Sequence, residues 1–199
     1  WFWLIFSAAT ALLALAVGAF LVRSVLDADT GTDKLREIAA AIQEGAMAYL
    51  KRQFRTIAII VVPVAIIVFF TSTKVVNTET GEVALTFVQS GLFRTLAFIA
   101  GCILSGLTGF IGMSLAVRGN VRTAAAARSG SMPAALQVAF RTGGVAGMFT
   151  VGLGLLGATL IIMIFQNTAS AILIGFGFGG SLLALFLRVG GGIFTKAAD

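Results

Sequence analysis

Five long apolar runs constrain the fold of this chain more than any other feature of its sequence. They cover residues 2–22, 56–72, 87–117, 134–165 and 169–187. A helix needs about 20 apolar residues to cross a hydrocarbon core, because the core is about 30 Å thick and each residue adds about 1.5 Å. Backbone amides and carbonyls surrounded by lipid must bond to each other, so each run is predicted to form a membrane helix.

The composition supports the same class of fold. Hydrophobic residues make up 58% of the 199 residues and charged residues only 11%, and the mean hydropathy is +1.02. About a quarter of the residues of an ordinary soluble domain are charged. We therefore predict an all-α, polytopic transmembrane helix bundle with five membrane helices, whose main partner is the lipid bilayer.

The two ends of the chain suggest that it is a piece of a longer protein. It begins with Trp1 rather than Met, and its first apolar run has neither a basic leader nor a small-residue cleavage site, so it does not resemble a signal peptide. It stops at Asp199, directly after a Gly-rich stretch. We expect residues 1–199 to form a single part of one transmembrane domain, cut at both ends.

Basic residues gather in two of the four connections between the apolar runs. The connection after the first run carries Arg23, Lys34, Arg36, Lys51, Arg52 and Arg55, and the one after the third carries Arg118, Arg122, Arg128 and Arg141. The connection after the second run has only Lys74, and residues 166–170 have no charge. Because cytoplasmic connections are enriched in Lys and Arg, we predict an external N-terminus and a cytoplasmic position for Lys196 and Asp199.

This topology accounts for the net charge of +6 without nucleic acid. DNA or RNA binding would need a basic groove with stacking aromatic side chains in water, so no nucleic-acid partner is expected. The compact connections fit a bacterial inner membrane. The segment between Val75 and Val83 is predicted to be an exposed turn or short hairpin around Thr80 and Gly81.

Residues 32–54 form the one soluble-looking helix. Thr32 or Asp33 is a suitable N-cap, and Glu37 lies in an early turn. Apolar residues then recur at three- and four-residue steps: Leu35, Ile38, Ala39, Ile42, Ala46, Tyr49 and Leu50. We expect this segment to run on into the second membrane helix as a cytoplasmic extension.

Several kinds of chemistry are excluded within this segment. Cys102 is the only cysteine and there is no histidine, which rules out a disulfide, a histidine metal site and a histidine general base. Cys102 lies inside an apolar run and is expected to be a packing residue. Gly175, Gly177 and Gly180 match the spacing of a dinucleotide-binding loop, but a membrane helix lacks the preceding strand that such a loop requires.

Small residues recur at four-residue spacing in the last three runs. The rows are Gly101, Ser105 and Gly109, then Gly143 and Gly147, then Gly175 and Gly179. Such rows allow helix backbones to approach closely in membranes. We expect them to mark tight helix packing.

Three charged residues end the fifth run: Arg188, Lys196 and Asp199. If the helix continues through residues 190–192, Arg188 and Asp199 are about 20° apart around its axis and about 16 Å apart along it. Ionisable residues in membrane helices usually face an interior pathway. A snorkelling Arg188 and a solvated pair of Lys196 and Asp199 are the alternatives that these residues alone leave open.

This stretch resembles the signature of membrane-bound, ion-translocating inorganic pyrophosphatases. The resemblance rests on Gly-Gly-Gly-Ile-Phe-Thr-Lys-Ala-Ala-Asp at residues 190–199, with Arg188 before it. Residues 42–54 and 109–123, and Ala-Phe-Arg-Thr-Gly-Gly from residue 139, are also similar to that family. The resemblance implies a homodimer and a larger fold of about sixteen membrane helices, of which this chain is the N-terminal part.

The resemblance also implies roles for the three charged residues. Lys196 matches a lysine that contacts pyrophosphate, Asp199 an aspartate that holds Mg²⁺, and Arg188 the arginine of an ion gate. The implied enzyme is an Mg²⁺-dependent diphosphatase that pumps H⁺ or Na⁺ out of the cytoplasm, with K⁺ as an activator in one subclass. With one candidate carboxylate, this segment alone is expected to be inactive.

Two other classes of protein stay open. A secondary transporter without hydrolysis would also have Gly-rich helices and an arginine at membrane depth. A structural membrane subunit would tolerate replacement of both Arg188 and Lys196.

Overall fold

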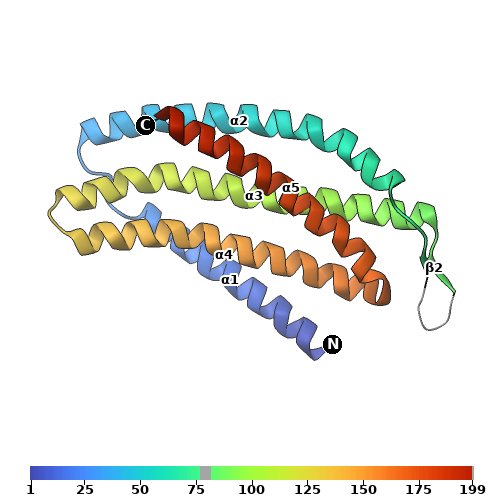
Figure 1. Ribbon diagram of the computed structural model, residues 1–199. Helices are drawn as coiled ribbons and strands as arrows, with labels where there is room; N and C mark the ends of the chain where they lie inside the picture. Colours follow the sequence, from blue (N-terminus) through green and yellow to red (C-terminus); the bar gives the residue numbers. More distant parts are fainter. Residues whose placement is uncertain (77–81, 199) are drawn as a thin grey trace.

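The computed structural model describes residues 1–76 and 82–198, and it consists almost entirely of long helices (Figure 1). In chain order the elements are α1 (Phe2–Leu26), α2 (Asp33–Phe70), β1 (Val75–Val76), β2 (Val83–Leu85), α3 (Phe87–Arg128), α4 (Met132–Phe165), the 3₁₀ helix η1 (Gln166–Thr168) and α5 (Ala169–Ala198). The all-α prediction is thereby confirmed for the described residues.

Within those residues, four helical stretches are long and apolar enough to cross a membrane, and not the five separate spans that we expected. The last two expected spans lie in one helical stretch, Met132–Gly192. The reason is their connection, which is the 3₁₀ helix η1 rather than a loop. Gln166, with φ 42°, starts the reversal that folds α5 back from α4 (Figure 1). The chain is thus part of an integral, multi-pass membrane protein.

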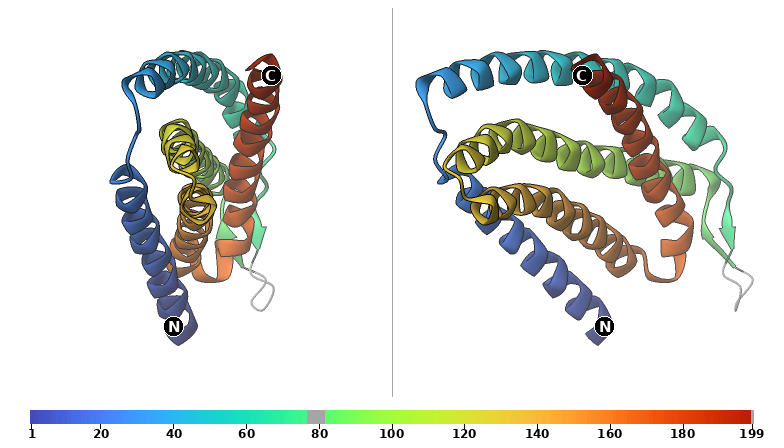
Figure 2. Two further views of the ribbon diagram at one scale, coloured as in Figure 1. Left: turned by 90° about the vertical axis from the view of Figure 1, so that its left-hand side faces the viewer. Right: turned by 60° about the vertical axis from the view of Figure 1, so that its left-hand side comes forward.

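Helix α3 lies at the centre of the bundle. It packs against α2, α4 and α5, while α1 lies along α4 (Figure 2). Three core clusters follow its length: one around Val25, Leu115 and Val145, one around Val68, Phe98 and Cys102, and one around Leu85, Ala97 and Ile172. Every other long helix is therefore positioned directly or indirectly by α3.

Helix α2 begins where the sequence indicates. Thr32 is its N-cap, with the extended backbone angles φ −73° and ψ 160°, and Asp33 supplies the acidic residue of the first turn. The helix continues without interruption from Asp33 to Phe70 and includes Pro63. The predicted continuity of residues 32–54 with the second membrane run is confirmed.

Glycines let α5 lie directly on the backbone of α3. A Cβ atom on Gly179 would lie 2.9 Å from the carbonyl carbon of Phe98, and one on Gly175 would overlap the carbonyl oxygen of Arg94. Real Cβ atoms essentially never come closer than 3.0 Å. The predicted close packing is confirmed for Gly101, Gly175 and Gly179. For Gly143 and Gly147 it stays a prediction, because a Cβ atom there would meet no described atom within 4 Å.

Hydrogen bonds join the same two helices. The Cys102 thiol donates to the Gly179 carbonyl at 3.4 Å, and the Ser105 hydroxyl donates to the Gly180 carbonyl at 3.0 Å. Cys102 is buried, in agreement with the expected packing role. Gly175, Gly177 and Gly180 lie inside α5, which follows η1 and not a strand, so the context of a dinucleotide-binding loop is missing.

Two of the basic residues that indicated topology also fasten α1. The Arg122 guanidinium donates to the carbonyls of Leu26 at 3.0 Å and Ala28 at 3.2 Å, just where α1 ends. Arg141 on α4 donates to the Ser24 hydroxyl at 2.6 Å. A cation near the last carbonyls of a helix interacts favourably with its dipole.

A short hairpin connects α2 to α3. Strands β1 and β2 pair in antiparallel orientation, with Val75 opposite Leu85 and Val76 opposite Val83. This confirms the predicted hairpin at its strands. Thr80 and Gly81, predicted to form its turn, lie outside the described residues.

Candidate functional site

The candidate site lies on the second half of α5. This helix runs without interruption through residues 190–192 to Ala198, as the proposed alignment of Arg188 with the end of the chain requires. Its end lies at the same end of the bundle as the connections between α1 and α2 and between α3 and α4, and opposite to the hairpin (Figures 1 and 2). The structure therefore gathers Lys196 and the basic connections at one end of the bundle.

Arg188 lies on the face of α5 that points away from α3. The face toward α3 is buried and contains Ile172, Gly175, Gly179 and Leu183. Arg188 and Ser181 lie on the opposite face, and both are exposed. Among the described residues, no hydrogen bond or ion pair joins Arg188 to another side chain.

Lys196 lies in the last turn of α5, and its side chain is exposed. It is eight residues beyond Arg188, which corresponds to about 12 Å along the axis. Asp199, the predicted metal ligand, lies outside the described residues, so its relation to Lys196 stays a prediction. Arg188 and Lys196 therefore share one exposed helix without touching each other.

The described residues do not assemble a metal site by themselves. They contain no group of three or more His, Cys, Asp or Glu side chains that could hold a metal ion. Mg²⁺ prefers six oxygen ligands in octahedral geometry. A magnesium site at this end of α5 would need carboxylates from outside the described part.

Helix α2 supports α5 beside Arg188. The Gln53 side-chain amide donates to the Phe186 carbonyl at 2.9 Å. A Cβ atom on Gly190 would overlap the Tyr49 hydroxyl and the Gln53 amide, so the missing side chain of Gly190 brings the two helices together.

The sequence did not single out Gln53 as part of this region. Its one signal is its position four residues after Tyr49, on the same face of a helix whose other positions on that face are apolar. An amide placed on a packing face requires a hydrogen-bond partner. That partner, a main-chain carbonyl of α5, could not be identified without the tertiary structure.

This arrangement can bring cations to an anionic ligand at one end of a bundle. Two cations lie on exposed positions of one helix, about 12 Å apart along its axis and about 80° apart around it, and another face of the helix is fixed to α3. The Lys196 ammonium and the Arg188 guanidinium donate hydrogen bonds and accept none, so both are suited to binding an anionic group.

Comparisons with known proteins agree on one family. The family model described as inorganic H⁺ pyrophosphatase matches residues 12–199. The chain is 53% identical over 189 residues to the K(+)-insensitive pyrophosphate-energized proton pump of Chloroflexus aurantiacus, covering 91% of this chain and 24% of that protein. It is 48% identical to the pump of the same name from Streptomyces avermitilis, covering 95% of this chain and 24% of that protein. It is 44% identical to the pump of the same name from Methanosarcina mazei, covering 98% of this chain and 26% of that protein. The chain thus spans about a quarter of the length of these curated relatives.

Proposed function

Because this chain belongs to the inorganic H⁺ pyrophosphatase family, we propose that it is part of a membrane enzyme that hydrolyses inorganic pyrophosphate and pumps protons out of the cytoplasm. One observation carries the proposal. The family model matches nearly the whole chain, and the relatives that share 44–53% of its residues are named pyrophosphate-energized proton pumps. The segment alone contributes one wall of the site and is expected to be inactive.

Lys196 is the proposed substrate-binding residue. It projects from the last turn of α5, at the bundle end that holds the basic connections. Pyrophosphate carries several negative charges, and hydrolysis places further charge on the leaving phosphate. An ammonium group close to those oxygens stabilises that charge in the transition state.

Arg188 is the proposed residue of an ion gate below the hydrolytic site. It lies about 12 Å deeper along α5 than Lys196, on the face that the described helices leave open. An arginine at membrane depth is costly unless an acidic group or a carbonyl pairs with it. Its partner would come from another part of the full-length protein.

Asp199 is the proposed ligand of Mg²⁺. When bound, the ion would neutralise charge on the phosphate oxygens. A second carboxylate about one helical turn beyond Asp199 would lie on the same face and complete the ligand set from this helix. The described residues contain no group of three or more side chains that could serve as this set of ligands.

The relatives' names guide the choice of ion. All three are described as K(+)-insensitive proton pumps. We therefore propose H⁺ rather than Na⁺ as the transported ion and activity without K⁺. A homodimer in a bacterial inner membrane, with the N-terminus outside and Lys196 and Asp199 in the cytoplasm, completes the proposal.

Vesicles that contain the full-length protein test this function. Pyrophosphate and Mg²⁺ should release phosphate and acidify the vesicle interior, in the absence of K⁺ and Na⁺. Lys196→Ala should lower phosphate release and proton uptake at least about 100-fold, the loss typical of one removed electrostatic contact to the transition state. Lys34→Ala, which removes an exposed lysine from the start of α2, is the control and should leave both unchanged.

Other outcomes of this assay would contradict the proposal. A substrate carried without pyrophosphate consumption would favour a secondary transporter. Full activity of Arg188→Ala and Lys196→Ala together would favour a structural subunit. Phosphate release by the purified 199-residue segment would show that the segment is a complete enzyme.

A further inference from the structure

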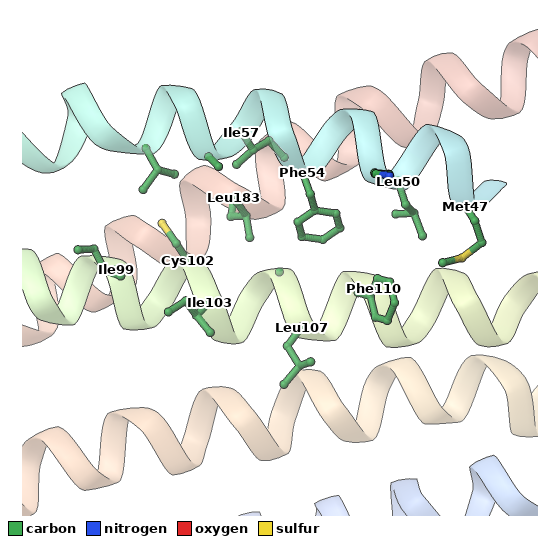
Figure 3. Close-up of a pocket in the computed structure, with 14 residues that line it drawn as sticks. Met47, Leu50, Phe54, Ile57, Ile99, Cys102, Ile103, Leu107, Phe110 and Leu183 are labelled. Atoms are coloured by element: carbon green, nitrogen blue, oxygen red, sulfur yellow. The ribbon is translucent and has the colours of Figure 1, made fainter. Parts of the chain in front are cut away.

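An apolar groove of about 900 Å³ lies between α2 and α3, with α5 behind it (Figure 3). Its floor is closed by side chains that are at most 6% exposed: Leu50, Ile57, Cys102 and Leu183. Its rim is open, since Ile99, Ile103, Leu107 and Phe110 are 36–62% exposed. The groove is thus a strip of apolar surface that requires an apolar occupant.

One end of this groove is cationic. Lys51 is the one charged residue among those that line the groove in the described structure, and it is exposed. Arg52 and Arg55, also exposed, follow within the next turn of α2. The nearest carboxylate along α2 is Glu44, about 10 Å before Lys51 along the axis, which is about one Debye length. The cations therefore dominate this end.

The depth of the groove matches one leaflet of a bilayer. From Lys51 to Phe70, where α2 ends, the helix rises by about 30 Å, which is the thickness of a hydrocarbon core. This places Lys51 at the interface between core and headgroups. From Lys51 to Val61, the deepest lining residue on α2, the rise is about 15 Å, or half of the core.

We propose that this groove binds an anionic phospholipid, with an acyl chain along its apolar floor and the phosphate beside Lys51. Charge complementarity selects the headgroup, because Lys51, which lines the groove, attracts an anion at the interface. The depth of the groove fits an acyl chain, because an acyl chain of one leaflet spans the same half of the hydrocarbon core. The lipid site is independent of the proposed pyrophosphatase activity, and the membrane orientation decides only which leaflet supplies the lipid.

Photolabelling of the full-length protein tests this site. The probe is phosphatidylglycerol with a photoreactive diazirine in the middle of one acyl chain. Nanodiscs with the same lipids in both leaflets make the result independent of orientation. Peptides that contain residues 54–61 and 99–110 should carry most of the label. Unlabelled phosphatidylglycerol should compete about fivefold better than phosphatidylcholine, the factor that one basic residue near a membrane surface supplies.

Variants separate the headgroup from the tail. Lys51→Gln should abolish this fivefold preference, and Lys51→Arg should keep it. Leu107→Trp, which fills the open rim, should lower the labelling by the probe itself. The matched controls are Lys34→Gln, a lysine of α2 that does not line the groove, and Leu96→Trp, an α3 side chain of similar exposure (53% against 43%) outside it. Neither control should change the labelling.

Two results would overturn the proposal. Equal competition by the two lipids, in the wild type as in Lys51→Gln, would show that the headgroup is not recognised. An absence of label from both peptides, together with label elsewhere on the protein, would show that other helices or a second copy cover the groove. Thermal unfolding of each variant in the same nanodiscs shows whether it has folded, so a misfolded variant cannot imitate either result.

Discussion

Helices α5 and α2 both lie on α3, but they meet it in different ways. Helix α5 is in backbone contact with α3, through glycines and three hydrogen bonds from Arg94, Cys102 and Ser105 to main-chain carbonyls. Helix α2 meets α3 through large side chains such as Phe54 and Phe110, whose rings are 6.4 Å apart, and an open groove remains beside them. The difference shows that α5 is held on α3 by a close-packed seam, formed by residues 94–105 of α3 and 171–180 of α5. Helix α2, in contrast, leaves room for a lipid.

The largest expected effect comes from the seam itself. Phe98 is fully buried, and its ring stacks on Phe178 at 5.6 Å. Phe98→Ala should destabilise the protein by about 3–5 kcal/mol, because it leaves a cavity in a packed core. Leu107→Ala, on the rim of the groove, should cost less than about 1 kcal/mol, since this side chain is 43% exposed. Unfolding of the full-length protein in bicelles measures the free energy of unfolding of both variants. Equal losses would contradict the difference between the α3–α5 contact and the groove.

A single methyl group on the seam should have the next largest effect. Gly179→Ala should cost about 1–3 kcal/mol, because its Cβ atom would meet the carbonyl carbon of Phe98 at 2.9 Å and cannot be accommodated without a backbone shift. Gly180→Ala is the matched control, since its Cβ atom would meet only the Gly101 carbonyl oxygen at 3.9 Å. Thermal unfolding of both variants provides the measurement. If Gly180→Ala proved as harmful as Gly179→Ala, helix proximity would not be the cause.

Removal of the tie between α2 and α5 should have a smaller effect. Gln53→Leu loses the hydrogen bond to the Phe186 carbonyl, which should cost about 1 kcal/mol. If this bond positions the end of α5, the variant should also lower phosphate release at saturating pyrophosphate. Gln43→Leu, ten residues earlier on α2, is the control for the change of side chain. Unchanged turnover in Gln53→Leu would show that the seam with α3 is sufficient to hold α5.

The smallest effect is expected at a hydrogen bond on the seam. Ser105→Ala removes the bond to the Gly180 carbonyl, and such bonds between membrane helices contribute about 0.6 kcal/mol on average. Thr108→Ala is a suitable control, because the Thr108 hydroxyl bonds within its own helix, to the Leu104 carbonyl. A loss above about 2 kcal/mol in Ser105→Ala would mean that hydrogen bonds hold the seam more than close packing does.

Much of this molecule could be predicted from the sequence because its helices depend on local features. The N-cap of α2 at Thr32 and the continuity of this helix into the second apolar run follow from capping and apolar patterns. Whether α5 continues through residues 190–192 was left open by the sequence. The number of separate spans did not follow. A 3₁₀ turn joins α4 to α5, and the uncharged link at residues 166–170 does not distinguish it from a loop.

Glycine spacing shows where prediction from the sequence stops. Gly175 and Gly179 contact α3, while Gly143 and Gly147, with the same spacing, contact no described helix. Four-residue spacing places small residues on one face of a helix, but it does not tell which neighbour covers that face. Gln53 and Arg122 are similar cases, because their partners are main-chain carbonyls far away along the chain.

By itself, the sequence determined that this chain forms membrane helices, which connections between them carry the basic residues, and which family the chain resembles. Each depends on residue type within a short window, because helical hydrogen bonds close within four residues and the bilayer imposes a fixed length. Only the tertiary structure decided that α5 lies on α3, that Gln53 holds α5 beside Arg188, and that α2 leaves a groove lined by Lys51. Those outcomes depend on the shapes of side chains from distant segments, which meet only after the helices have packed.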